Sequence, residues 1–377
     1  MKKKLLSAML MASCFCYGQA KKAITDDARL NKCILENTAY FTFNGAEPAG
    51  EGWSRLENLF AQNQFVAWGE YHNSPLLSQL TGFALASASK NGYKTWCTET
   101  SPFAASQLTW IAKTSNPYDT IISFSKTNHL TPTFPFFESR ADIQMLQTAS
   151  KLNYRIWGID QEFQLTFPYC ISKIFAGVPN ASKPLYKAVR DSLLAKWWMP
   201  DAKLLDSLRK VVKRPDLKHL IDEVEISRDI YNTGDSQTRA TLMKRNFYNY
   251  FDALKSKNEK IFFKMGSNHL ARGMNLETNL YDIGNTIFEL SEHNGTGFAN
   301  VYFMVRYWKD KDKVIDDIES DEHQNPKVFS RLYDREKWVT IDIRSLRRRI
   351  KNDGSLTLDT YKLIEKYDYV VISPEIL

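Results

Sequence analysis

Two histidines stand three residues after a glycine, and their spacing makes them the leading candidates for chemistry in this chain. Gly69-Glu70-Tyr71-His72 and Gly266-Ser267-Asn268-His269 repeat the spacing Gly-x-x-His, each at the end of a short apolar run. Histidine gains or loses a proton near neutral pH, and its neutral ring binds metals. The repeated layout predicts that His72 and His269 lie close together in space although they are far apart in the sequence.

Acidic side chains follow the same kind of run. Glu70 belongs to the first motif, Glu99 follows a second apolar run, and Asp160 follows a third. An unpaired carboxylate is costly to bury, so each acid either works at a site or pairs with Arg or Lys in a structural role. We predict one site that contains Glu70, His72, Glu99, His269 and Asp160. Arg272, three residues after His269, is the candidate for binding an anionic group of a substrate.

This set of side chains supports two routes to hydrolysis. In one, the two neutral imidazoles and one or two of the carboxylates hold a divalent metal (Mn, Co, Fe or Zn) that acidifies a bound water. In the other, one histidine deprotonates water and a glutamate fixes the tautomer of that histidine. The second histidine then stabilises or protonates the reacting substrate. The sequence leaves both routes open. It contains no Gly-x-Ser-x-Gly elbow, Walker loop or dinucleotide fingerprint, which argues against serine-hydrolase, nucleotide and NAD chemistry.

The elements that must position these residues follow an α/β pattern. Short apolar runs alternate with longer amphipathic stretches, which is typical of a mostly parallel sheet flanked by helices. Strands are predicted at Phe65–Trp68, Lys94–Thr98, Arg155–Ile159, Lys260–Lys264, Ala299–Val305, Val339–Ile343 and Tyr369–Ile372. The carboxyl ends of parallel strands line one crevice, so the candidate residues should converge there.

Helix starts are marked at several points. Ser74-Pro75 and Ser101-Pro102 are N-cap and N1 pairs that follow the first two strands. Ser54-Arg55-Leu56-Glu57 has the form of a capping box for an earlier helix. The charge-dense stretch Trp308–Glu336 is predicted to be a solvated connection.

A helical insertion is predicted between about residues 168 and 258, where the strand signal disappears. Helical stretches are expected at Leu185–Lys196, Ala202–Val212, Leu217–Tyr231 and Thr238–Leu254. The insertion is either a lid over the site or an extra layer of the fold. We expect it to belong to a single domain that spans residues 21–377.

The first twenty residues have the composition of a signal peptide. Lys2, Lys3 and Lys4 precede the apolar stretch Leu5–Ala12, and small residues follow at Gly18-Gln19-Ala20. The apolar stretch is too short to cross a bilayer. An alternative is a lipid anchor on Cys14, which would be the protein's only contact with a membrane. Either way we expect an exported protein, in the periplasm or at the cell surface.

Composition restricts the remaining possibilities. A hydrophobic content of 43% supports a sizeable core, and the net charge of +7 includes the three N-terminal lysines. This excess does not argue for nucleic acid, and no zinc-finger or helix-turn-helix pattern is present. The expected partner is a small-molecule or peptide substrate. Cys33 and Cys170 are the one pair that we consider for a disulfide.

The motifs resemble those of a known superfamily. Phe65–Ser74 is similar to the Gly-Glu-x-His opening of ChaN-like proteins and to the Gly-Glu segment of erythromycin esterases. The two Gly-x-x-His motifs, with a glutamate between them, also resemble TraB/Tiki proteins. Ile156–Asp160 and Tyr367–Ile372 are similar to late core strands of the erythromycin-esterase branch. The resemblance runs in outline from about Phe65 to the C-terminus and is close at short motifs.

Each branch implies a different function. The Tiki branch implies a metal-dependent protease with His72, His269 and Glu99 in the metal site. The erythromycin-esterase branch implies hydrolysis by a histidine-activated water, although its members space the glutamate and histidine more widely than Glu70 and His72. The ChaN branch implies an exported haem-binding protein without enzymatic activity. We expect an exported hydrolase of ester or amide bonds, with a haem- or iron-binding protein as the alternative.

Overall fold

The computed structural model describes residues 28–43, 46–127, 134–196, 199–320, 325–350 and 356–377. The predicted signal peptide and the alternative anchor at Cys14 lie outside the described residues. Within these ranges, the helices are all too short or too polar to cross a bilayer.

A nine-stranded, mostly parallel sheet forms the centre of the molecule. Its strands are β1 (Thr38–Phe41), β2 (Phe65–Glu70), β3 (Thr95–Thr98), β4 (Arg155–Gly158), β5 (Ile261–Gly266), β6 (Phe298–Asp310), β7 (Lys313–Asp316), β8 (Trp338–Asp342) and β9 (Tyr369–Ile376). The spatial order is β1-β8-β9-β6-β2-β5-β3-β4, and β7 pairs with β6. The pairs β1–β8, β8–β9 and β6–β7 are antiparallel, whereas the remaining pairs are parallel. The predicted α/β fold with a mostly parallel sheet is confirmed.

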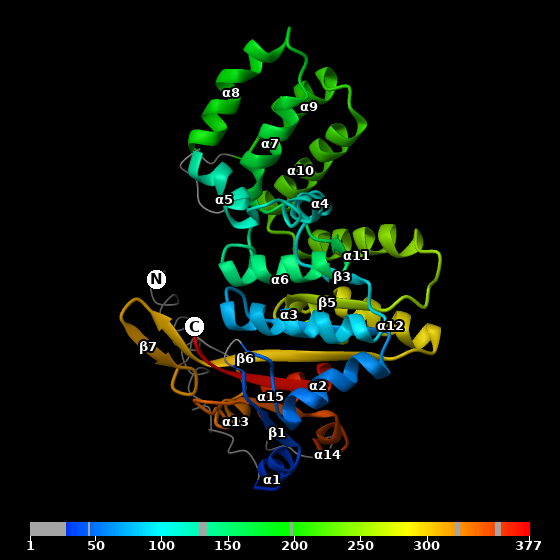
Figure 1. Ribbon diagram of the computed structural model, residues 1–377, viewed down its shortest axis with the longest axis vertical. Helices are drawn as coiled ribbons and strands as arrows, with labels where there is room; N and C mark the ends of the chain where they lie inside the picture. Colours follow the sequence, from blue (N-terminus) through cyan, green and yellow to red (C-terminus); the bar gives the residue numbers. More distant parts are fainter. Residues whose placement is uncertain (1–27, 44–45, 128–133, 197–198, 321–324, 351–355) are drawn as a thin grey trace, which may run out of the picture.

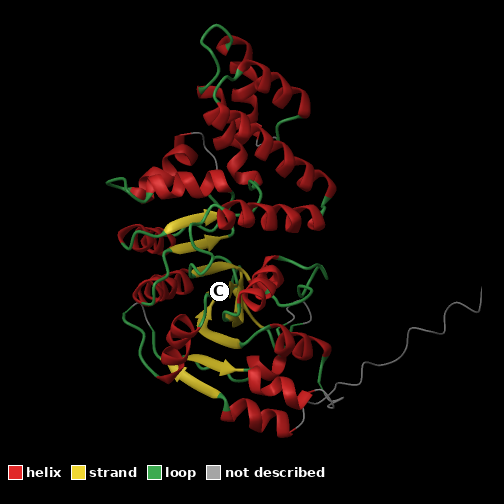
Figure 2. Cartoon of the chain, turned by 90° about the vertical axis from the view of Figure 1, so that its right-hand side faces the viewer, coloured by secondary structure: helices red, strands yellow, loops and turns green. Residues whose placement is uncertain are grey.

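Helices cover both faces of the sheet (Figure 2). They are α1 (Ala28–Glu36), α2 (Glu51–Gln62), α3 (Pro75–Lys90), α4 (Pro102–Ile111), α5 (Pro117–Thr127), α6 (Arg140–Lys151), α7 (Phe167–Ala176), α8 (Lys183–Lys196), α9 (Ala202–Val211), α10 (Pro215–Thr233), α11 (Ser236–Asp252), α12 (Ile283–Asn294), α13 (Lys327–Ser330), α14 (Arg347–Ile350) and α15 (Leu358–Lys366). The 3₁₀ turn Ser267–Leu270 directly follows β5.

The starts of α3 and α4 confirm the two Ser-Pro signals. Ser74 Oγ accepts a hydrogen bond from the Leu77 N–H, and Ser101 Oγ accepts one from the Ala104 N–H. The capping box predicted at Ser54 is wrong, because α2 begins one turn earlier and Ser54 lies inside it. The N-cap is Gly50 at φ 131°, where an added Cβ would lie 2.7 Å from the Tyr40 carbonyl oxygen. A residue with a Cβ would be strained at this positive φ, and its Cβ would lie too close to the Tyr40 carbonyl oxygen.

Two strands were not predicted from the sequence, for different reasons. β1 is a four-residue strand at the edge of the sheet, and its short run carries little periodicity. β7 lies in the stretch predicted to be a solvated connection, which is therefore wrong for residues 308–316. There, β6 continues to Asp310 and turns back into β7, with the Arg306 side chain bound to Asp316.

The helical insertion predicted between core strands is confirmed, since α7 to α11 lie between β4 and β5 in the chain. Figure 1 shows α7–α10 as a bundle beyond the β4 edge of the sheet. This bundle has its own core, which includes Phe167, Leu205 and Leu220. The last helix, α11, returns to the sheet, where Phe247 packs on Trp157 and Phe263.

The three cysteines among the described residues are buried free thiols, so the Cys33–Cys170 disulfide is not formed. Cys33 packs with β8 and β9, whereas Cys170 lies in the core of the helical insertion.

Candidate active site

The ends of three neighbouring strands bring the predicted residues together. β2, β5 and β3 lie side by side and run parallel, with Glu70 in register with Gly266 and Thr98 in register with Lys264. Glu70 is the last residue of β2, and the segments that leave the three strands carry His72, Glu99 and His269. All four side chains line one cavity of about 460 Å³.

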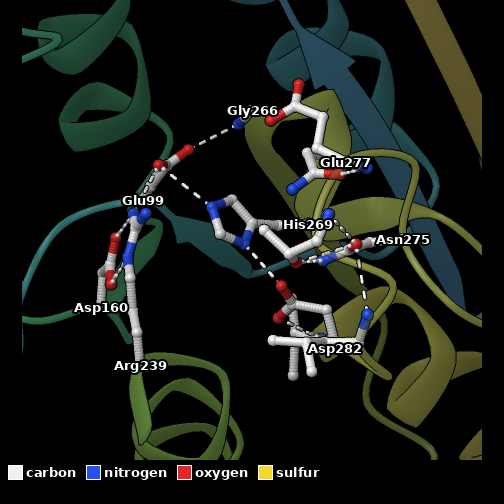
Figure 3. Close-up of polar contacts among 12 residues, drawn as sticks. Glu99, Asp160, Arg239, Gly266, His269, Asn275, Glu277 and Asp282 are labelled. Carbon is white, nitrogen blue, oxygen red and sulfur yellow. Dashed lines mark hydrogen bonds and ion pairs between the residues drawn. The ribbon is translucent and has the colours of Figure 1, made fainter. Parts of the chain in front are cut away.

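Glu99 is the centre of this arrangement (Figure 3). Its Oε2 accepts a hydrogen bond of 2.6 Å from the Gly266 N–H, and its Oε1 accepts one of 2.9 Å from Arg239. His269 Nε2 lies 3.4 Å from Oε1, and His72 Nε2 lies 3.7 Å from Oε2. Burial alone would raise the pKa of Glu99, but His269, His72 and Arg239 hold it well below its usual value. Glu99 is therefore a fixed anion and a poor base.

His269 is held between two carboxylates. Its Nδ1 lies 2.8 Å from Asp282 Oδ2, and the other Asp282 oxygen accepts the N–H of Ile283 at the start of α12. Burial lowers the pKa of His269, but Glu99 and Asp282 outweigh burial and raise the pKa to about 10. His269 is consequently an imidazolium at neutral pH.

The charge on His269 predicts a pH dependence of stability. Its pKa is about 10 when folded and 6.5 when unfolded, so the folded state binds more protons between these values. The stabilisation is complete below about pH 6.5 and disappears as the pH rises through about 10. We expect the free energy of unfolding, measured in urea, to fall between about pH 7 and pH 10, and to fall less in His269→Gln. An equal fall in both proteins would contradict this assignment.

His72 is the more accessible histidine, with 34% of its side chain exposed. Its Nδ1 lies 3.5 Å from Glu70 Oε1 and has no hydrogen-bond partner among the described residues, and its ring stacks on Phe136 at 4.1 Å. Burial lowers the pKa of His72, but Glu70 and Glu99 outweigh burial, so the pKa lies above the usual value. Of the two site histidines, His72 alone is set up to exchange a proton with solvent.

Glu70 is fixed from the opposite side by Lys264, which points from β5 into an ion pair with it. Both side chains are buried. Burial raises the pKa of Glu70, but Lys264 and His72 outweigh burial and lower the pKa. Glu70 is thus an anion with one oxygen on Lys264 and the other facing His72 Nδ1.

Asp160 supports the site through another residue. Its carboxylate binds the guanidinium of Arg239, with Arg239 Nε 3.0 Å from Oδ1, and does not line the cavity. Arg239 comes from α11 and bridges Asp160 to Glu99 (Figure 3). The insertion therefore contributes a wall of the cavity through its last helix, which also supplies Ser236 and Ala240.

Arg272 does not face the cavity. Its guanidinium binds Asp368 and also donates to Asn300 Oδ1 and to the Phe298 carbonyl oxygen. Spacing placed it near His269, but the chain turns after the 3₁₀ segment and directs Arg272 towards β6 and the residues before β9. Its predicted contact with an anionic substrate group is therefore not supported by the geometry.

Four charged residues of the site were missed from the sequence: Lys264, Asp282, Arg239, and Glu277, which also lines the cavity. Lys264 offered a signal, because a lysine within an otherwise apolar buried strand needs a partner. Asp282 carried only the signature of a helix N-cap. Arg239 carried no signal, because a cation in an amphipathic helix usually faces solvent.

The residues do not fit the predicted metal. Both oxygens of Glu99 accept N–H hydrogen bonds, one of them from a guanidinium. His269 Nδ1 lies 2.8 Å from Asp282 Oδ2 and its Nε2 lies 3.4 Å from Glu99 Oε1, so both ring nitrogens are engaged with carboxylates of the protein. Nor does any group of three or more His, Cys, Asp or Glu side chains have the arrangement of a metal site in the part of the chain that the structure describes.

Gly266 touches the site so closely that a methyl group there should reduce activity. A Cβ on this residue would lie 3.0 Å from both Glu99 Oε2 and His72 Nε2, although the backbone, with φ −48°, accepts alanine. We expect Gly266→Ala to lower kcat about 10- to 100-fold by displacing these groups. Its Tm should stay close to that of the wild type. Unchanged kcat in a folded variant would show that neither group needs its present position.

Comparisons with known proteins identify the fold. No family model matches the chain, and no curated protein matches it. A protein from Bacillus cereus of solved structure is 14% identical, with a TM-score of 0.54 over 92% of this chain and 97% of that one. A succinoglycan biosynthesis protein is 15% identical, with a TM-score of 0.54 over 91% and 96%.

An enzyme is among the similar structures. A mutant of erythromycin esterase EreC in its open conformation is 14% identical, with a TM-score of 0.51 over 85% of this chain and 93% of that one. This chain has the erythromycin-esterase fold. The predicted resemblance to that superfamily is confirmed at the level of fold. ChaN of Campylobacter jejuni, with bound haem, reaches a TM-score of only 0.36 and is too distant to bear on function.

Proposed function

We propose that this protein hydrolyses an ester or amide bond with a water molecule that His72 activates, without a metal. The observation that carries the proposal is the division of charge among the site residues. Glu70 and Glu99 are held as anions and His269 as a cation, so among these four residues His72 is the one whose protonation can change during turnover. When the environments of neighbouring titratable groups shift their pKa values in different directions, the groups can take different roles as acid and base.

The proton movements follow from the geometry. Neutral His72 accepts a proton from water through Nε2, while Glu70 faces Nδ1 and favours the tautomer with the proton there. The water oxygen bonds to the carbonyl carbon, and the π electrons move to the carbonyl oxygen. His269 and Arg239 supply positive charge beside this oxyanion. When the C–O or C–N bond breaks, His72 returns its proton to the leaving group.

The cavity suits a small polar substrate. Its volume of about 460 Å³ lies in the range of small-molecule sites. Beyond the charged residues, its lining includes the hydroxyls and amides of Ser236, Ser267, Asn268, Asn275 and Thr278. These groups can bind the oxygens of a hydroxylated ester. The likeness to erythromycin esterase supports hydrolysis as a class, whereas the spacing of Glu70 and His72 gives no support for its particular substrate.

The tyrosine of the cavity does not favour the haem-binding alternative. Tyr71 is the one tyrosine among the residues that line it. Burial and then Glu375 raise the pKa of Tyr71 far above its usual value, so it is a poor source of the phenolate that binds haem iron.

We propose that the protein acts outside the cytoplasm. This proposal rests on the N-terminal sequence alone. The lysines and the short apolar stretch in residues 1–20 support cleavage and release, and Cys14 supports an anchored form. N-terminal sequencing of the protein recovered from its native host separates the two.

A substrate panel with and without a chelator tests the proposal. We expect the purified chain to hydrolyse at least one of a set of aryl esters, lactones and aryl amides, at the same rate after dialysis against EDTA. The reason is that His269 and Glu99 are engaged with protein groups. Activity that EDTA abolishes and Mn, Co or Zn restores would contradict the metal-free route. No hydrolysis across the panel, together with a Soret band on addition of haemin that Tyr71→Phe removes, would favour haem binding.

A further inference from the structure

A second cavity, of about 280 Å³, lies on the other side of Asp160. The segment after β4, the start of α4, and helices α10 and α11 line it. None of its lining residues lines the active-site cavity.

Two further carboxylates of this cavity, Glu162 and Glu223, make no direct ion pair with Arg or Lys among the described residues, although Arg245 also lines the cavity. Asp160 and Asp222 also line it, but Arg239 binds Asp160 and Arg209 binds Asp222. Glu162 is 1% exposed and accepts a hydrogen bond from Ser101, and Glu223 faces the neighbouring His219 at 3.4 Å.

The environment of these two carboxylates keeps them partly protonated. Burial raises the pKa of Glu162 to about 7, and burial together with Glu162 raises that of Glu223 to about 7. The other titratable or charged groups that face them are Asp160, Asp222, His219, Arg245 and the Cys170 thiol. The cost of burying this pair is not fully offset by Arg245, and a further cation bound in the cavity would reduce it.

Hydrogen-bond acceptors also point to a missing donor. Glu162 Oε2 and Gln161 Oε1 are buried and have no hydrogen-bond partner among the described residues. A buried polar atom without a partner costs about 1–3 kcal/mol. Gln161 Oε1 and the ionised form of Glu162 Oε2 are acceptors, and both residues line this cavity, so a ligand that satisfies them donates N–H or O–H bonds.

We propose that this cavity binds a small organic cation, an aliphatic amine or guanidine. Its N–H groups donate to Glu162, Gln161 and Glu223, and its carbon chain lies against Ile226 and Leu242. A bare metal ion fits less well, because the described residues offer no group of three or more metal-binding side chains. The proposal does not rest on the proposed hydrolysis: the two cavities share no lining residue, and Asp160 connects them through Arg239.

Calorimetric titration of the purified chain with 1,4-diaminobutane tests this site, with 1,4-butanediol as the uncharged ligand of similar shape. We expect the diamine to bind and the diol not to bind. Glu223→Gln, which changes a side chain that is 16% exposed, should weaken diamine binding at least tenfold. Asp206→Asn is the matched control, because its side chain is 60% exposed, is bound to Arg209 and does not line the cavity, and it should change affinity less than twofold.

A second readout identifies the carboxyls and does not require Glu162 to be replaced. Binding of the cation should lower the pKa of the pair and release about one proton per diamine near pH 7, as measured in buffers of different ionisation enthalpy. His72→Asn should bind the diamine as the wild type does. Absence of diamine binding, equal binding of the diol, unchanged affinity in Glu223→Gln, or loss of binding in His72→Asn would each overturn the assignment.

Discussion

Replacement of His72 by asparagine should lower kcat for ester hydrolysis by about 10²–10⁴-fold, the range that removal of a general base produces. The side chain is partly exposed, and its Nδ1 makes no hydrogen bond with another described residue. The substitution does not leave a buried charge without a partner, because Lys264 still pairs with Glu70 and Arg239 still pairs with Glu99. The Tm should therefore shift by only about 2 °C or less.

A matched control is His219→Asn, which changes an exposed histidine on α10 that lies outside the active-site cavity. It should keep kcat within about twofold of the wild type. If His72→Asn remained fully active, the site would need another base. If it unfolded, the residue would be structural. Steady-state kinetics and thermal unfolding on the same preparations separate these outcomes.

The largest effect on stability is expected from Arg239→Met. Arg239 is the cation that both Asp160 and Glu99 share, and both carboxylates are buried. Removal of one partner from a buried ion pair leaves a buried charge without compensation and costs about 3–5 kcal/mol. We expect a loss of this order in the free energy of unfolding, measured with urea. Activity should fall as well, because Glu99 loses a group that fixes it.

Arg209→Met is the matched comparison. Arg209 also binds several carboxylates, Asp206, Asp222 and Glu225, but they lie at the surface of the helical insertion. Exposed pairs contribute about 1 kcal/mol or less, so this variant should be nearly as stable as the wild type. Adding Asp160→Asn to Arg239→Met should restore part of the lost stability, because it removes one of the two unpaired buried charges. Equal losses in the two arginine variants would show that Asp160 and Glu99 do not depend on Arg239.

The sequence was sufficient to predict those site residues whose positions are determined by the end of a strand. Glu70, Glu99 and His269 are each within a few residues of a strand end, and parallel neighbours bring such positions to one edge. His72 follows the same rule. The core strands were recognisable because strands buried on both faces are continuous apolar runs.

The contacts that assign roles could not be predicted in the same way. Asp282 and Arg239 reach the site from helices whose orientation depends on tertiary packing, and no spacing rule connects them to His269 or Glu99. Without these two residues, His269 and Glu99 resemble free metal ligands. With them, both are occupied by hydrogen bonds and ion pairs. Arg272 shows the converse error, since proximity to His269 in sequence did not determine the direction of its side chain.

The pH dependence of kcat/KM, recorded beside the NMR titration of the His72 imidazole, tests the central claim most directly. Signals are assigned with His72→Asn, and the chain contains six histidines in total. If His72 must be neutral to activate water, kcat/KM should rise with pH along a limb whose midpoint equals the His72 pKa, above 6.5. An activity that stays constant while His72 titrates, or whose midpoint differs from that of His72, would contradict the assignment of His72 as the base.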